Sequence, residues 1–207
     1  IYPGVDVTVL RPGLDTTGLR ESLGIHPEEK LVFSVGRLSR RKGFDQMIRA
    51  VAQLRAEGIA LRYVIAGIGE DADYLDGLIA EHNAQGIVHR IGAVSDADLP
   101  RWLNACDVFA MPNREINGDN EGFGMVFIEA AACGKPSIAG RAGGTGSAVI
   151  DGETGLRVDG DSLGAIVGGL RGMVENECLR SHMGDAGRLR VLEQFSWDAV
   201  ASKTRGV

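Results

Sequence analysis

Short apolar runs that end in glycine or proline recur along this chain, with helical patterns between them. Leu31–Val35 and Tyr63–Ala66 are followed directly by glycines, and Pro112 follows a third run. Apolar residues recur at steps of three and four in between, from Phe44 to Leu54, which is one face of a helix. Strands that alternate with amphipathic helices predict an α/β fold, with a parallel sheet covered by helices on both faces. The runs expected to form strands are Leu31–Val35, Tyr63–Ala66, Ile87–Ile91, Val108–Met111 and Ser137–Ala139.

The length of the chain favours one folded domain. It has 207 residues, of which 44% are hydrophobic, enough for one substantial core. Residues 1–29 mix proline, glycine and charge and are interpreted as a linker and lead-in, so that residues 30–207 form the domain itself. The first residue is Ile1, not methionine. We therefore expect the chain to be a fragment of a longer protein.

Charge and cysteine content narrow the class of protein. The net charge of −6 disfavours a nucleic-acid partner, which requires a basic face. Cys106, Cys133 and Cys178 lie far apart in mostly apolar settings, which predicts reduced, buried thiols in a cytoplasmic protein. The four histidines have no ligand spacing, so no metal site is predicted. No apolar stretch reaches the ~18–20 residues that would span a bilayer, and no signal peptide is recognised.

A cationic loop, residues 36–43, follows the first predicted strand. Four of the six residues from Arg37 to Lys42 are basic. In parallel sheets ligands bind at the carboxyl ends of the strands, so this loop is placed to hold a diphosphate. We expect Arg37 and Lys42 to point inward, and Arg40 and Arg41 to point outward. The alternatives are a solvated loop or a surface for anionic lipid.

Two glutamates eight positions apart, Glu121 and Glu129, bracket a glycine-rich loop that opens into an apolar, Ala-rich helix. The free N–H groups at the start of such a helix suit an anion, whereas the carboxylates suit hydroxyl groups. Phosphates and hydroxyls on one ligand describe a sugar nucleotide. We therefore expect the cationic loop from Arg37 and the carboxylates of Glu121 and Glu129 to converge on one cavity. A surface carboxylate without a function is the alternative for Glu129. Its apolar neighbours argue against this alternative, because burying an unpaired charge is costly.

Two further glycine-rich loops permit weaker inferences. Gly67, Gly69 and Ala72 fit a relaxed dinucleotide pattern, which would suit an NAD-dependent oxidoreductase. The pattern follows the second strand instead of the first, so we favour a tight turn, with backbone approach to a ligand as a secondary role. The loop 143–146 is either a ligand contact or a plain turn.

Taken together and in order, these motifs resemble the retaining glycosyltransferases of family 4. The matching segments are Gly36-Arg37 with Lys42-Gly43, Met111-Pro112, Glu121 to Glu129, Gly143-Gly144 and Asp151 to Gly155. Enzymes of that family have the GT-B fold, in which two Rossmann-like halves face each other across a cleft. The likeness runs from Tyr2 through Trp197. It implies that this chain is the carboxyl-terminal, donor-binding half, and that the amino-terminal acceptor domain is absent.

The resemblance also implies roles for individual residues. Arg37 and Lys42 would bind the donor diphosphate and offset charge on the leaving group, and Glu121 would hydrogen-bond the transferred sugar. Glu129 would hold the ribose hydroxyls. The implied catalytic residues are Arg37, Lys42 and Glu121. The implied donor-binding residues are Gly36, Gly67, Gly122, Phe123, Gly124, Met125, Val126 and Glu129. The family requires no metal or cofactor and transfers the sugar with retention of anomeric configuration.

The chain departs from the family pattern at two places. Ser147 stands where the family often has a glutamate, which puts a contact by the Gly143–Gly144 loop in doubt. Residues 114–120 form an insertion before Glu121, and a similar polar extension occurs in some bacterial lipid mannosyltransferases of the family.

We therefore expect a hexosyltransferase that moves mannose or glucose from a GDP- or UDP-sugar to a lipid or glycan, with GDP-mannose as the leading donor. The full protein would be cytoplasmic, with possible peripheral contact at the inner membrane face. The fragment alone is expected to be inactive. A non-catalytic nucleotide- or lipid-binding module remains an alternative.

Overall fold

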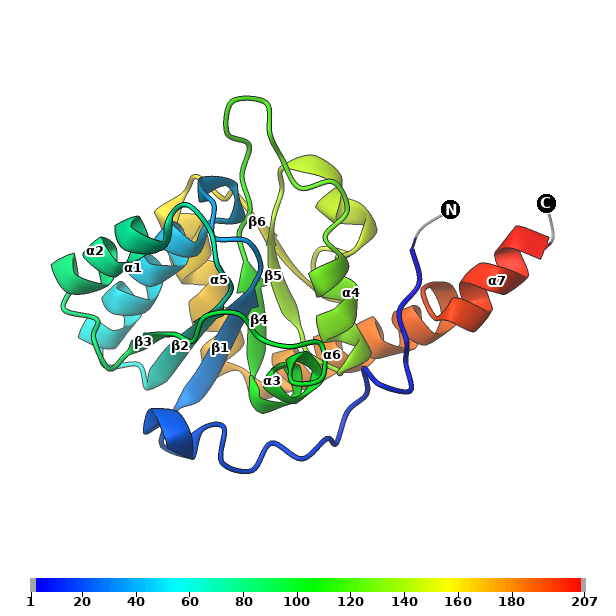
Figure 1. The fold of residues 1–207 in the computed structure, drawn as a ribbon, viewed down its shortest axis with the longest axis horizontal. Helices are drawn as coiled ribbons and strands as arrows, with labels where there is room; N and C mark the ends of the chain where they lie inside the picture. Colours follow the sequence, from blue (N-terminus) through cyan, green and yellow to red (C-terminus); the bar gives the residue numbers. More distant parts are fainter. Residues whose placement is uncertain (1–2, 206–207) are drawn as a thin grey trace.

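The computed structural model describes residues 3–205 and contains a six-stranded sheet in the order β3-β2-β1-β4-β5-β6 (Figure 1). The strands are β1 (Lys30–Val35), β2 (Leu61–Ala66), β3 (Val88–Arg90), β4 (Val108–Met111), β5 (Ser137–Gly140) and β6 (Gly155–Val158). Every neighbouring pair is parallel. The five expected strands are present, and the predicted α/β fold is confirmed.

Helices cover both faces of the sheet, as predicted. The helices are α1 (Phe44–Ala56), α2 (Ala72–Glu81), α3 (Leu99–Ala105), α4 (Met125–Ala132), α5 (Leu163–Glu175), α6 (Glu177–Gln194) and α7 (Trp197–Arg205). The buried residues of α1, α2 and α5 form one apolar cluster with the sheet, whereas those of α3 and α4 form another on the opposite face. Helix α6 contributes to both clusters through Met183 and Val191. Cys106 and Cys133 are buried in the second cluster as predicted, but the prediction is wrong for Cys178, which is exposed on α6. None of the helices in residues 3–205 is long and apolar enough to cross a membrane.

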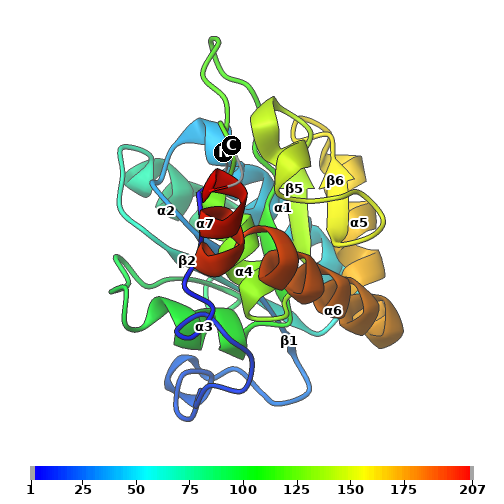
Figure 2. The same cartoon turned by 90° about the vertical axis from the view of Figure 1, so that its right-hand side faces the viewer.

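The two ends of the chain differ from expectation in detail. Part of the lead-in packs on the domain, because Val5 and Ile25 are buried. The Val5 N–H donates to the Phe195 carbonyl at 2.8 Å, and the N-terminal segment runs beside the junction of α6 and α7 (Figure 2). The separate helix α7 was not anticipated. Tyr2, where the resemblance begins, lies outside the described residues.

Strands β1 and β4 form the point at which the winding of the sheet reverses. From β1 the chain proceeds outward to β2 and β3, and from β4 it proceeds the other way to β5 and β6. The loops after β1 and β4 therefore diverge and leave a crevice between them, where α/β sheets of this kind bind ligands. These are the cationic loop 36–43 and the segment that leads to Glu121.

The insertion before Glu121 forms a hairpin, residues 115–120, which stands above this rim of the sheet (Figure 1). Ile116 and Asp119 pair through two backbone hydrogen bonds of 2.9 Å. Asn117 and Gly118 at the tip have φ of 52° and 81°. Left-handed residues at both central positions are typical of a type I′ turn, which accounts for the Asn-Gly sequence.

Candidate functional site

Lys42 and Glu121 meet at the crevice between β1 and β4. The Lys42 Nζ lies 2.5 Å from the Glu121 Oε2, and both side chains are largely buried. The cationic loop reaches this position through a 3-10 turn (Arg40–Lys42) that ends at Gly43, where φ is 77°. A Cβ atom at Gly43 would lie 2.3 Å from the Pro112 carbonyl oxygen, so only glycine permits this approach. The cationic loop thus meets Glu121 as expected, whereas within residues 3–205 no ion pair links Arg37 or Glu129, expected at the same cavity, to Lys42 or Glu121.

Glu121 also pairs with Arg41, which was expected to point outward. The Arg41 Nη1 lies 2.9 Å from the same carboxylate oxygen that binds Lys42. The outward prediction for Arg41 is wrong because the hairpin 115–120 brings carboxylates over that side of the loop. The prediction for Arg40 is confirmed: this side chain is 44% exposed, pairs with Asp71 and stacks on the ring of Tyr74.

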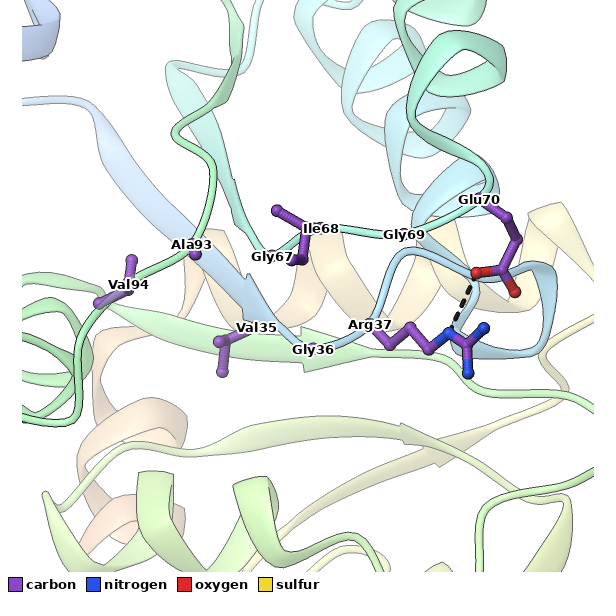
Figure 3. Close-up of a pocket in the computed structure, with 9 residues that line it drawn as sticks. All are labelled: Val35, Gly36, Arg37, Gly67, Ile68, Gly69, Glu70, Ala93 and Val94. Carbon is purple, nitrogen blue, oxygen red and sulfur yellow. Dashed lines mark hydrogen bonds and ion pairs between the residues drawn. The ribbon is translucent and has the colours of Figure 1, made fainter.

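Arg37 was expected to point inward, and this prediction is wrong as well. Its side chain is 73% exposed and pairs with Glu70 at 3.0 Å. Figure 3 shows the two side chains turned toward each other at one end of a cavity. Glu70 follows the glycine turn after β2, which places its carboxylate within reach of Arg37. In the described structure each of the four cations in the loop is thus neutralised by a carboxylate.

This cavity has a volume of about 660 Å³ and lies over the ends of β1, β2 and β3. Its lining is apolar toward Val35 and Val94 and ionic at Arg37 and Glu70 (Figure 3). The residues that line it are Val35, Gly36, Arg37, Gly67, Ile68, Gly69, Glu70, Ala93 and Val94. Its size and mixed chemistry suit an organic ligand with an apolar ring and a charged end.

Close approach between two loops explains the glycines of the weak dinucleotide pattern. A Cβ atom at Gly67 would lie 1.9 Å from the Gly36 carbonyl oxygen, and one at Gly69 would lie 2.4 Å from that of Leu38. The tight-turn interpretation is confirmed only for residues 69–72, where the Ala72 N–H donates to the Gly69 carbonyl at 3.3 Å, whereas Gly67 is required by the close approach of the loop after β1. Gly36 and Gly67 both line the cavity, so a ligand there would meet bare backbone.

The Gly143–Gly144 loop supports the segment that carries Glu121. The Gly144 N–H donates to the Glu121 carbonyl at 2.8 Å. A Cβ atom at Gly144 would lie 1.7 Å from the Gly122 carbonyl oxygen. Gly124, with φ of 82°, then opens α4 and brings the first-turn N–H groups to the same rim. This glycine pair therefore supports the backbone of the Glu121 loop.

Glu129 lies partly buried on α4, one turn beyond the start of the helix. Burial raises the pKa of its carboxyl group, and the negative charge of Asp96 raises this pKa further. Among residues 3–205 no cation pairs with this carboxylate. Met125 and Val126, in the first turn of the same helix, belong to the apolar cluster that includes Val35 and Val94 of the cavity wall. Glu129 is not among the residues that line the cavity, but a partly buried carboxylate without a cationic partner can accept hydrogen bonds from hydroxyl groups.

Arg114 was not recognised as important from the sequence. It is buried and forms two hydrogen bonds to Asp45, of 3.0 and 2.8 Å. Its N–H donates to the Arg41 carbonyl at 2.8 Å. Arg114 therefore joins the base of the hairpin to both the cationic loop and the first turn of α1. No pattern of apolar residues in the sequence distinguishes Arg114 from a solvent-exposed arginine.

Comparison with known proteins identifies the family. Residues 15–190 match the family described as glycosyl transferases group 1. The chain belongs to this family. The resemblance inferred from the motifs is thus confirmed at the level of group 1 glycosyl transferases.

Among similar proteins, a GDP-mannose-dependent alpha-(1-6)-phosphatidylinositol monomannoside mannosyltransferase of Mycolicibacterium smegmatis is 35% identical over 208 residues. That match covers 99% of this chain and 53% of the relative. A D-inositol 3-phosphate glycosyltransferase of Mycobacterium marinum is 37% identical over 209 residues, covering 96% of this chain and 42% of the relative. The chain thus spans about half the length of these relatives.

A solved structure shares the fold of this chain. Sucrose-phosphate synthase of Thermosynechococcus elongatus superposes with a TM-score of 0.85 at 29% identity, covering 100% of this chain and 50% of that one. Within residues 3–205, no group of three or more histidine, cysteine, aspartate or glutamate side chains is arranged to hold a metal ion.

Proposed function

We propose that this chain is the donor-binding, carboxyl-terminal half of a retaining glycosyltransferase of the family 4 type. In this proposal, residues 1–29 are the interdomain segment, residues 30–207 bind a nucleotide diphosphate sugar, and an amino-terminal domain supplies the acceptor site. The observation that carries the proposal is the contact between Lys42 and Glu121 at 2.5 Å. It places a cation suited to phosphate beside a carboxylate suited to sugar hydroxyls, at the crevice of the sheet.

The diphosphate would lie against Lys42 and the first-turn N–H groups of α4, with Arg37 turning in from the mouth of the cavity. The pair between Arg37 and Glu70 is exposed, and such pairs contribute little to stability. Exchange of Glu70 for a phosphate is therefore easy. Fixed positive charges at the leaving phosphate stabilise the charge that develops there, which is the role a metal ion has in other enzymes.

The remainder of the donor would occupy the rim on both sides of the diphosphate. The cavity of about 660 Å³ would take the base, with Gly36 and Gly67 offering close backbone approach. Glu129 would accept hydrogen bonds from the ribose hydroxyls. Glu121 would hold the transferred sugar, together with the backbone of residues 122–126.

GDP-mannose is the proposed donor, because a relative that matches 99% of the chain is named as GDP-mannose-dependent. The names of both relatives contain an inositol phosphate, once within a lipid and once free. We therefore propose an acceptor of the inositol phosphate class for the full protein, with a lipid-linked form preferred. A lipid acceptor would require peripheral contact with a membrane, which we propose to be the inner membrane, reached from the cytoplasm.

A thermal-shift screen with GDP-mannose, UDP-glucose and an ADP-sugar tests the proposal, because a ligand that binds only the folded state raises its melting temperature. We expect the largest rise with GDP-mannose. No rise with any sugar nucleotide would overturn the proposal. NADH should produce no response, in contrast to the expectation for an oxidoreductase that uses Gly67 and Gly69. We also expect this chain alone to transfer no sugar, since it lacks the facing half that closes the cleft.

Retention of the chain on anionic vesicles through Arg40 and Arg41, without binding of any sugar nucleotide, would instead favour a non-catalytic lipid-binding module. The structure offers little support for that alternative. Both arginines already pair with carboxylates, and the cavity beside them is lined by three acidic residues as well.

A further inference from the structure

Arg41 bridges three consecutive residues at the base of the hairpin. Its Nε lies 3.1 Å from the Asp119 carboxylate, and its Nη1 lies 2.9 Å from the Glu121 carboxylate. The same Nη1 approaches the Asn120 carbonyl at 3.4 Å. The guanidinium therefore spans the segment that leads into Glu121, which a single point charge would not do.

The backbone of Arg41 is itself held in place. Its carbonyl accepts the 2.8 Å hydrogen bond from the Arg114 N–H. Arg114 is locked by two side-chain hydrogen bonds to Asp45, in the first turn of α1. Arg41 is thus fixed at its main chain by the body of the domain and at its side chain by the hairpin. Its own side chain is 23% exposed.

Lys42 and Arg41, the two cations that pair with Glu121, differ in how readily a bound diphosphate would draw them away from it. Lys42 carries a compact charge on a flexible stem, so an incoming phosphate competes with Glu121 for its ammonium. Arg41 has a rigid fork that Asp119 already holds from the other side. When Lys42 turns to phosphate, Arg41 is the cation that remains on Glu121.

We propose that Arg41 is a positioning residue for recognition of the transferred sugar. It holds the Glu121 carboxylate in the position and orientation in which it can accept hydrogen bonds from the sugar hydroxyls, while Lys42 binds the diphosphate. This inference rests on the proposed function. It assigns to the insertion 114–120 the task of supplying Asp119 as the second anchor for the Arg41 fork.

The test compares sugar nucleotides with the corresponding nucleoside diphosphates. Calorimetry would give the affinities of GDP-mannose and GDP, and of UDP-glucose and UDP, for the unmodified chain and for Arg41→Gln. We expect Arg41→Gln to weaken binding of the sugar nucleotide by about tenfold, which corresponds to ~1.4 kcal/mol. The affinity for the nucleoside diphosphate should change by less than about twofold, which corresponds to ~0.4 kcal/mol. A purely structural role for Arg41 would not change the ratio of the affinity for the sugar nucleotide to the affinity for the nucleoside diphosphate.

Three further variants sharpen the test. Arg41→Lys keeps the positive charge but loses the planar guanidinium with its several N–H donors. It should therefore restore part of the preference for the sugar nucleotide over the nucleoside diphosphate. Asp119→Asn removes the second anchor and should give a smaller shift in the same direction; it lies on an exposed hairpin and keeps the proposal testable if Arg41→Gln does not fold. Arg40→Gln is the matched control. That neighbouring arginine pairs with Asp71 and stacks on Tyr74, so the ratio should stay unchanged.

Equal losses for sugar nucleotide and nucleoside diphosphate would show that Arg41 acts on the phosphates, and would overturn the inference. An unchanged ratio in Arg41→Gln and Asp119→Asn would overturn it as well, while leaving the proposed function standing. Failure of the unmodified chain to bind any sugar nucleotide would overturn the proposed function and this inference together.

Discussion

The ammonium of Lys42 and the carboxylate of Glu121 are 2.5 Å apart, although 79 positions separate them in the chain. Lys42 ends the loop after β1, and Glu121 stands in the loop after β4. The two strands are neighbours in the sheet, so their following loops share one rim. In the proposed function, the donor site extends from this pair in both directions.

Removal of the Lys42 charge should therefore act on phosphate binding. We expect Lys42→Met to weaken GDP binding by about 10- to 150-fold, the effect of losing a charged hydrogen bond of ~1.5–3 kcal/mol. Guanosine, which has no phosphate, should bind as before. Calorimetry with both ligands checks this, and Lys203→Met on the exposed surface of α7 is the control. Equal weakening of both ligands would contradict a role for Lys42 at the diphosphate.

The exposed pair between Arg37 and Glu70 predicts opposite effects for its two members. Arg37→Ala should weaken GDP far more than guanosine. Glu70→Gln should strengthen GDP binding by a factor of about two to three, since it removes the carboxylate that competes for Arg37. The effect should shrink in high salt, which screens exposed charges. Weaker GDP binding by Glu70→Gln would mean that Glu70 itself contacts the ligand.

Glu129 should reduce stability at neutral pH. Burial and Asp96 raise its pKa in the folded state above the unfolded value. Its favourable contribution is thus complete below the unfolded pKa of about 4.3 and is lost as pH rises through the folded pKa. Glu129→Gln should raise the melting temperature at pH 7 but not at pH 4; each kcal/mol recovered raises it by about 2–4 °C. The same variant should bind GDP-mannose more weakly, and a melting temperature unchanged at pH 7 would contradict the argument.

The buried pair of Arg114 and Asp45 should matter for folding. Removing one partner of a buried pair typically costs about 3–5 kcal/mol. Arg49 lies 3.5 Å from Asp45 and remains as a partial partner. We therefore expect Arg114→Met to lower the free energy of unfolding by an amount near the lower end of this range. Urea denaturation measures the loss. The double variant Arg114→Met with Asp45→Leu should recover part of it, and failure to recover any would show that shape, not charge, is decisive there.

Two glycines of the chain predict opposite responses to alanine. A Cβ atom at Gly144 would lie 1.7 Å from the Gly122 carbonyl oxygen, so Gly144→Ala should displace the Glu121 loop and cost about 1–3 kcal/mol. Gly172 lies within α5 with nothing inside 4 Å of an added Cβ atom, so Gly172→Ala should stabilise the helix by about 1 kcal/mol. Thermal denaturation compares the two. GDP-mannose binding should fall only in Gly144→Ala.

The sequence by itself determined the fold and the rim of the sheet at which Lys42 and Glu121 meet. Apolar runs of strand length alternate with helical periodicity, and this pattern admits few architectures other than a parallel sheet covered on both faces. The convergence of Lys42 with Glu121 then followed from topology alone, because the carboxyl ends of parallel strands share a rim. The order of the glycine and acidic motifs indicated the family.

Only the tertiary structure decided where the arginines point and what they hold. Arg37 turns outward to Glu70 and Arg41 turns inward to Glu121, the reverse of the expectation. The buried ion pair between Arg114 and Asp45 was not predicted. The reason is physical: an arginine in a short loop has no periodicity to set its direction. Its position depends on which carboxylates other loops bring within reach: Glu70 lies 33 positions from Arg37, and Glu121, directly after the hairpin 115–120, lies 80 positions from Arg41.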